Sequence, residues 1–318
     1  MRYDIMRKVS GIVLALCFMV GLSSVTRAAT GPIVSTKWLS KNLHKKGLVI
    51  LDVRTFEKYE KSHIPGAVKA FGPWQTMNEK FVGFMMPPVY RLVEMLRSYG
   101  VSNDSFVVVY DHGMTSQDTA KSARVIWTLH FLGHTKCAIL DGGFNAWDQA
   151  ELPETKKPTI PVRGDFTASI VASKVITLDD VKKRIGSHKT VFVDARDPME
   201  HFGHEKKAHI PRYGHLPGSL LMPADALTIG GQNFSPAFLR KADELSQLAR
   251  GVGIPTNKNV EIVVYSNHGL QAALVYFVLN DVLGYKNVRL FDGSILEAAK
   301  AKDVPMNMYS WGWTECKK

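Results

Sequence analysis

Short apolar runs rich in β-branched residues alternate along the chain with longer apolar segments of helical spacing. The short runs are residues 48–53, 106–110, 136–140, 190–193 and 260–265. Helical spacing is clearest at residues 123–132 and 272–283. Buried strands that alternate with helices indicate an α/β fold, in which a parallel sheet is covered by helices on both faces.

The same order of elements occurs twice, offset by about 150 residues. Each copy has an Asp-x-Arg sequence at a strand end, a His-x-Pro-Gly turn, a Val-Val-Tyr strand and an Asp-Gly turn. These motifs begin at Asp52, His63, Val108 and Asp141 in the first copy and at Asp194, His215, Val263 and Asp292 in the second. Four matches in the same order predict two tandem domains.

The predicted domains are residues 29–155 and residues 173–309. Between them, residues 156–172 contain Pro158, Pro161 and Gly164 and are expected to form a linker. Residues 310–318 are expected to form a short tail.

The first 28 residues predict a secretory signal peptide. Arg2, Arg7 and Lys8 precede an apolar run at residues 9–25, and cleavage is expected after Ala28. The run is at the short end for a bilayer span, which disfavours an uncleaved anchor. We therefore expect an exported protein, periplasmic or secreted, without a stable membrane span after cleavage.

The charge pattern argues against a nucleic-acid partner, and the cysteine content argues against a disulfide framework. The net charge is +11, and removal of the signal peptide leaves 36 basic and 28 acidic side chains. The basic residues are scattered and do not alternate with aromatic residues, so no nucleic-acid partner is expected. Cys137 lies in an apolar strand and Cys316 in the tail. Two cysteines are too few for a disulfide framework.

The matched motifs resemble those of the tandem-domain rhodanese family, the thiosulfate and 3-mercaptopyruvate sulfurtransferases. The resemblance covers about residues 33–308. It implies two rhodanese-like domains, the second of which has an active loop after its Val-Val-Tyr strand. In the family this loop begins with a cysteine, whose thiolate takes up a sulfane sulfur as a persulfide. Backbone N–H groups at the following helix N-terminus stabilise the negative charge.

Ser266 stands at the position of that cysteine. A serine hydroxyl is far less acidic than a thiol, so persulfide transfer is not expected there. The rest of the loop is predicted to bind a small oxyanion, such as thiosulfate or sulfite, through its N–H groups. The loop residues are Asn267, His268, Gly269, Leu270 and Gln271.

The resemblance also suggests a pocket beside this loop. Many family members place an arginine four residues after the Asp-x-Arg arginine, where this chain has Glu200. The candidate pocket residues are Asp194, Arg196, Glu200 and His215. His209 lies in an insertion before the second His-x-Pro-Gly turn and is expected near the pocket entrance.

Asp111 is the equivalent of Ser266 in the first domain, and the resemblance implies that this domain is silent. From Asp111 to Gly133 there are 22 positions, and from Ser266 to Gly284 there are 18. We therefore expect the first loop to be four residues longer and unable to form the same cradle.

Several structural roles compete with these functional ones. The two Asp-x-Arg pairs are expected to satisfy each other, and His63 and His215 to be hydrogen-bonded corner residues. No metal site is expected, because His201, His204, His209 and His215 lack the spacing of metal ligands. No cofactor is expected either.

Three functions remain open at this stage. The first is a degenerate sulfurtransferase relative, a pseudoenzyme that binds an anion or a protein partner. The second is an active sulfurtransferase of non-standard route, in which Cys316 or a partner's thiol visits the loop. The third is a structural subunit of an exported complex. A serine hydrolase would need His268 as base, and that side chain is expected to point outward.

Overall fold

The computed structural model describes residues 31–78 and 83–311 of the 318-residue chain. The predicted signal peptide and Cys316 lie outside the described residues. Within the described ranges, no helix has the length and apolar character needed to cross a membrane.

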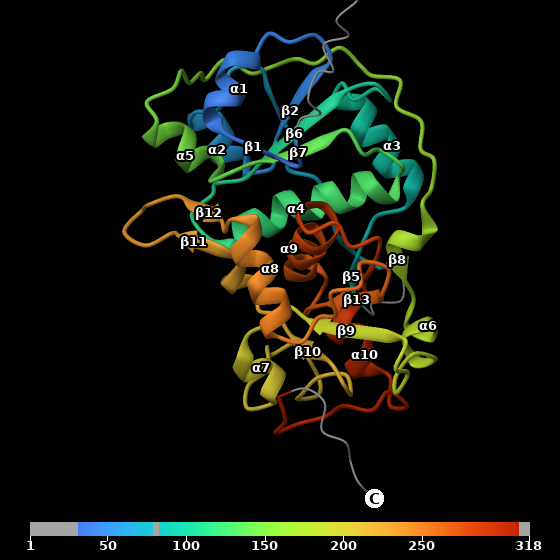
Figure 1. The fold of residues 1–318 in the computed structure, drawn as a ribbon. Coiled ribbons are helices and arrows are strands. Elements are labelled where there is room, and N and C mark those ends of the chain that lie inside the picture. Colours follow the sequence, from blue (N-terminus) through green and yellow to red (C-terminus); the bar gives the residue numbers. More distant parts are fainter. Residues whose placement is uncertain (1–30, 79–82, 312–318) are drawn as a thin grey trace, which may run out of the picture. The chain divides into compact units, whose positions relative to one another are not determined.

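The first half is built on a five-stranded parallel sheet with the order β1-β7-β6-β2-β3 (Figure 1). The strands are β1 (Ile33–Val34), β2 (Leu48–Asp52), β3 (Ala67–Lys69), β6 (Phe106–Tyr110) and β7 (Cys137–Leu140). The helices are α1 (Thr36–Asn42), α2 (Phe56–Lys61), α3 (Val89–Ser98), α4 (Ser116–Phe131) and α5 (Gly143–Gln149). Strands β4 (Thr76–Met77) and β5 (Phe84–Met85) form a small antiparallel pair.

The second half repeats this plan with the order β10-β9-β13-β14-β8. Its strands are β8 (Val175–Ile176), β9 (Thr190–Asp194), β10 (Leu220–Leu221), β13 (Glu261–Tyr265) and β14 (Asn287–Phe291). Its helices are α6 (Leu178–Lys182), α7 (Pro198–Phe202), α8 (Ala242–Gly251), α9 (Leu270–Phe277), the π-helix η3 (Val278–Val282) and α10 (Ser294–Lys300). Two 3₁₀ turns and an antiparallel pair complete it: η1 (Ala172–Lys174), η2 (Ala224–Leu227), β11 (Thr228–Gly230) and β12 (Ala237–Leu239).

Read from β8, the second sheet has the order β8-β14-β13-β9-β10, which matches the first sheet strand for strand. The predicted pair of parallel α/β domains is therefore confirmed. The segment between the halves has no regular element from Glu151 to Val171 and is hydrogen-bonded to the first half. There, Gly164, Phe166 and Ser169 donate N–H bonds to the first half's backbone.

Alternating side chains on each strand enter different cores, so helices are needed on both faces. On β6, Val108 and Tyr110 pack in a core with α1 and α5. Val107 and Val109 face the other way, into a larger core that also contains residues of β13 and β14. The inner faces of the two sheets therefore share one hydrophobic core.

Helices α4 and α9 lie at the centre of this shared core and pack against each other (Figure 1). Both helices are buried on nearly all sides. In α4 every residue from Ala120 to Phe131 is buried except Lys121, and in α9 every residue from Ala272 to Phe277 is buried. A helix that is apolar around most of its circumference is typical of an interior position.

An ion pair joins the two halves beside this helix contact. Arg124 of α4 donates to Asp292 Oδ1 at 2.6 Å, and their side chains are 1% and 10% exposed. Met86 N–H donates to the other Asp292 oxygen at 2.7 Å. The Arg124 guanidinium also lies 4.5 Å from the Trp127 ring centroid, within range of a cation–π contact.

Removal of this guanidinium is expected to destabilise the whole molecule. Arg124→Met leaves the Asp292 carboxylate buried without its cationic partner, which should lower the free energy of unfolding by about 3 kcal/mol. Urea denaturation followed by circular dichroism measures this change. Lys182→Met, which breaks an exposed pair with Asp303, is the control and should change stability little. Equal effects of the two substitutions would contradict the assignment.

Candidate functional site

The strand, loop and helix predicted around Ser266 are present. Strand β13 ends at Tyr265 and α9 begins at Leu270, two residues before the expected helix start at Ala272. Gly269 has a φ of 82°, and a Cβ there would lie 3.0 Å from Arg124 Nη1 and from Asp292 O. The loop thus needs glycine for its backbone conformation and for its close approach to the ion pair between the halves.

Ser266 is 1% exposed and held on both sides. Its Oγ accepts the N–H of Gly269 at 3.0 Å, and its own N–H donates to Ser294 Oγ at 3.2 Å. The hydroxyl therefore satisfies a backbone donor at the start of α9, as polar side chains at helix N-termini do. In the part of the chain that the structure describes, no contact joins Ser266 Oγ to an imidazole.

His268 contacts the first half and not Ser266. Gln75 donates to the His268 carbonyl at 2.6 Å, and the imidazole makes an edge contact with Phe84 at 6.0 Å between centroids. Burial lowers the pKa of His268, which keeps the ring neutral at neutral pH. Its side chain is half-buried and lines the pocket described below. The serine hydrolase alternative has no Ser–His contact to support it.

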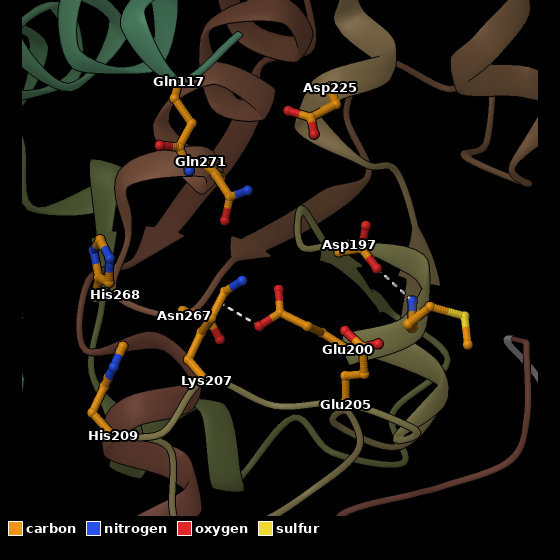
Figure 2. A pocket seen from close by; sticks show the side chains of 11 residues that line it. Gln117, Asp197, Glu200, Glu205, Lys207, His209, Asp225, Asn267, His268 and Gln271 are labelled. Atoms are coloured by element: carbon orange, nitrogen blue, oxygen red, sulfur yellow. Dashed lines mark hydrogen bonds between the residues drawn. The ribbon is translucent and has the colours of Figure 1, made fainter. Parts of the chain in front are cut away.

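A cavity of about 470 Å³ opens beside the loop (Figure 2). Its lining comes from the loop, α7, the insertion after α7, η2 and the first residues of α4 and α9. The lining residues are Gln117, Asp197, Met199, Glu200, Glu205, Lys207, His209, Asp225, Asn267, His268 and Gln271. The expectation that His209 lies at the pocket is confirmed.

Glu200 and Asn267 form the floor contact of this pocket. Asn267 Nδ2 donates to Glu200 Oε1 at 2.9 Å, drawn as a dashed line in Figure 2. Glu200 is 3% exposed and Asn267 is 4% exposed. Asn267 Oδ1 has no hydrogen-bond partner among the described residues. The Asn267 amide thus uses its donor on Glu200, and its buried acceptor is unpaired among the described residues.

Of the four predicted pocket residues, Glu200 alone is among those that line the cavity. The prediction was wrong for Asp194, Arg196 and His215. Arg196 donates to Asp194 through Nε and Nη2 at 3.0 and 2.7 Å, and Nη2 also donates to the Gly214 carbonyl. Burial acts to raise the pKa of Asp194, but Arg196 and His201 hold it below its usual value.

The expected structural roles of the Asp-x-Arg pairs and the turn histidines are confirmed. Arg54 binds Asp52 as Arg196 binds Asp194. His215 Nδ1 lies 2.7 Å from the carbonyl of His201, and the two rings stack at 3.8 Å. His63 repeats this arrangement with the Tyr59 carbonyl at 2.8 Å. Among the described residues, no three His, Cys, Asp or Glu side chains are arranged to hold a metal ion.

The first domain's loop differs from its counterpart in a way that residue counting did not predict. The loop from Asp111 to the cap residue Thr115 has five residues, against four from Ser266 to Gly269. The remaining difference lies in the helices that follow. Helix α4 has 16 residues, whereas α9 with 8 residues and η3 with 5 residues together are shorter. The expectation of a loop four residues longer is therefore wrong.

Backbone packs closely around Asp111 itself, although His112, the next residue of this loop, lines a cavity of about 420 Å³. A Cβ on Gly113 would lie 2.0 Å from the Gly142 carbonyl, and the cavity next to Asp111 measures about 10 Å³. Burial raises the pKa of Asp111 to about 7, although Lys121 lies 3.6 Å away. The close packing therefore leaves little space at the Asp111 carboxyl itself.

The positions four residues after the Asp-x-Arg arginines carry opposite charges in the two halves. Lys58 occupies this position in the first half, where it lines a cavity of about 420 Å³ with Arg54 and Lys61. Glu200 occupies it in the second half. The same backbone position thus places a cation in one pocket and a carboxylate in the other.

Cys137 is buried in β7, as predicted, at 7% exposure. Burial raises the pKa of its thiol well above the usual value. A thiol that stays protonated in a core is a poor nucleophile.

Two copies of a five-stranded parallel α/β domain, with a strand-loop-helix site in the second copy, define a two-domain protein of rhodanese-like architecture. The chain belongs to the rhodanese family, because the rhodanese-like domain model matches residues 35–150 and 177–301.

Individual relatives agree with this assignment. The chain is 30% identical to a "Putative thiosulfate sulfurtransferase" of Synechococcus elongatus, over 94% of this chain and 92% of the relative. It is 28% identical to the 3-mercaptopyruvate sulfurtransferase of Escherichia coli K12, over 86% and 96%. The crystal structure of SseA from Escherichia coli aligns with a TM-score of 0.68 and 26% identity, over 83% of this chain and 99% of that one.

Several pocket residues were not found from the sequence. Asp197 follows the Asp-x-Arg arginine directly, so its place near the strand end could have been predicted. Glu205 and Lys207 come from the insertion, Asp225 from a 3₁₀ turn and Gln117 from the other domain. No local pattern links these four to the loop.

The buried Asp111 carboxyl should make stability depend on pH. An unfolded aspartate has a pKa of about 3.9, so the raised folded-state pKa favours folding below that value and the contribution is lost as pH rises through about 7. Asp111→Asn cannot ionise and should gain stability relative to wild type between pH 4 and 8, on the order of 3 kcal/mol.

Urea denaturation at several pH values measures this gain. Asp104→Asn, at an exposed position, is the matched control and should give a difference that stays constant. A constant difference for Asp111→Asn as well would show that Asp111 does not titrate in this range.

Proposed function

We propose that this chain is an exported member of the rhodanese family that binds a small ligand beside its second-domain loop and does not transfer sulfur through that loop. The observation that carries the proposal is Ser266, a buried hydroxyl at the expected position of the nucleophile. Export is supported by the signal-peptide pattern of residues 1–28. Amino-terminal sequencing of the mature protein should therefore find Ala29 as its first residue.

The chemistry of sulfur transfer argues against activity at this loop. Attack on a sulfane donor needs a nucleophile that is ionised or paired with a base. Ser266 Oγ is instead used as the acceptor of Gly269 N–H, and the nearest histidine in the loop turns to Phe84. The hydroxyl thus has a structural role in the helix start.

Ligand binding is supported by the cavity that remains. Its volume of about 470 Å³ lies within the range of small-molecule sites. The first half has a cavity of about 420 Å³ at the equivalent place, lined by Lys58 and His112. Both halves therefore keep an open cavity beside the equivalent loop, and the two cavities differ in the side chains that line them.

A sulfur-transfer assay tests the proposal. Wild-type protein, Ser266→Ala and Ser266→Cys are incubated with thiosulfate or 3-mercaptopyruvate, and product formation with cyanide and the mass of the protein are measured. Wild type should match Ser266→Ala, because neither has a sulfur nucleophile in the loop. Ser266→Cys should gain the mass of one sulfur atom, since a thiolate there would meet the N–H groups of the helix start.

Transfer by wild type far above Ser266→Ala would contradict the proposal. Cys316→Ala serves as the control for the non-standard route. Sulfur uptake by wild type that is lost in Cys316→Ala would replace the proposal with an active enzyme that uses its tail cysteine.

A further inference from the structure

We propose that the pocket beside Ser266 binds a small organic cation with N–H donors, a primary ammonium or a guanidinium. This inference rests on the proposed function, because it names the ligand class of the same site. It replaces the oxyanion that the resemblance suggested.

The charges that line the cavity favour a cation. Four carboxylate side chains face it from three different segments, against one lysine and two histidines. The acidic residues are Asp197, Glu200, Glu205 and Asp225, and Figure 2 shows them on one side of the cavity with His209 and His268 on the other. Lys207 is exposed, so its flexible side chain can move into solvent. An oxyanion in this space would face several carboxylates at short range.

The floor of the pocket carries a buried acid. Glu200 is 3% exposed and accepts from Asn267 Nδ2 at 2.9 Å. Asn267 is 4% exposed, and its Oδ1 has no partner among the described residues. A buried carboxylate and a buried amide oxygen are costly unless donors satisfy them. An ammonium or guanidinium in the cavity carries several N–H groups and can donate to the Glu200 carboxylate, which lines it.

The size of the cavity favours an organic cation over a bare ion. A volume of about 470 Å³ is far larger than the roughly 30 Å³ that one water occupies in the liquid. An ammonium group attached to a carbon skeleton fills such a space and keeps its charge beside Glu200. Met199 and the stems of Gln117 and Gln271 supply contacts for that skeleton.

The carboxylate of Glu200 is not required by the fold. Lys58 holds the equivalent position in the first half, within the same arrangement of strand, Asp-x-Arg pair and short helix. The scaffold therefore accepts either charge at this position. The choice of a buried acid in the open pocket is consistent with recognition of a ligand.

Binding of simple amines tests the inference. Thermal shift and titration calorimetry are measured with n-butylamine and agmatine, with choline as a cation that lacks N–H donors, and with thiosulfate and magnesium chloride. Wild type should bind an amine saturably and melt at higher temperature. Glu200→Gln and Glu205→Gln should weaken binding about tenfold or more, because each removes a carboxylate charge. Glu205 is exposed, so this variant should fold normally even if Glu200→Gln does not.

Asp148→Asn, which removes an acid from the first-half cavity, is the matched control and should leave amine binding unchanged. No saturable amine binding, binding of choline equal to that of the amines, or binding of magnesium alone would overturn the inference. Thiosulfate binding without amine binding would overturn it and leave the proposed function intact. Sulfur transfer by wild type would overturn the proposed function whatever the amine result.

Discussion

Helices α4 and α9 pack against each other while each covers the inner face of its own parallel sheet. A parallel sheet needs both faces covered, and here the inner cover of each half is completed by the other half. The buried Arg124–Asp292 pair lies at the same junction and constrains the Gly269 turn. Since the loop that begins with Ser266 leads directly into α9, its position depends on this contact between the halves.

The two halves show how one backbone supports pockets of different character. Both keep an Asp-x-Arg ion pair and a stacked His corner, which are buried and serve the fold. The side chains that point into the cavities differ, with Lys58 in one and Glu200 in the other. The residues that stabilise the fold are therefore different from those that line the cavities.

The fold could be predicted from the sequence because strands, turns and helices each leave a local pattern, and the pattern occurs twice. The position of Ser266 followed from the same reasoning, as did the burial of Cys137. The length of the Asp111 loop could not, because a count between motifs does not separate loop residues from helix residues. Arg196 and His215 were assigned to the pocket from the family resemblance, whereas their partners, the Asp194 carboxylate and the His201 carbonyl, lie in the interior.

Local sequence patterns also could not predict the sign of the charge in the pocket. Asp225 and Gln117 reach it from a 3₁₀ turn and from the other half, and Glu205 comes from an insertion with no counterpart in the repeat. Charges brought together by long-range topology decide the chemistry of the cavity, and no single segment reveals their sum.

Because the two halves share one core, unfolding of one half should also destabilise the other. Residues of β6 and β13 belong to one continuous apolar cluster, so separation of the halves would expose the apolar surfaces of α4 and α9 to water. Each half therefore stabilises the other, and the two should melt in a single cooperative transition. A molecule seated beside Ser266 would protect residues of the first domain from proteolysis as effectively as those it touches.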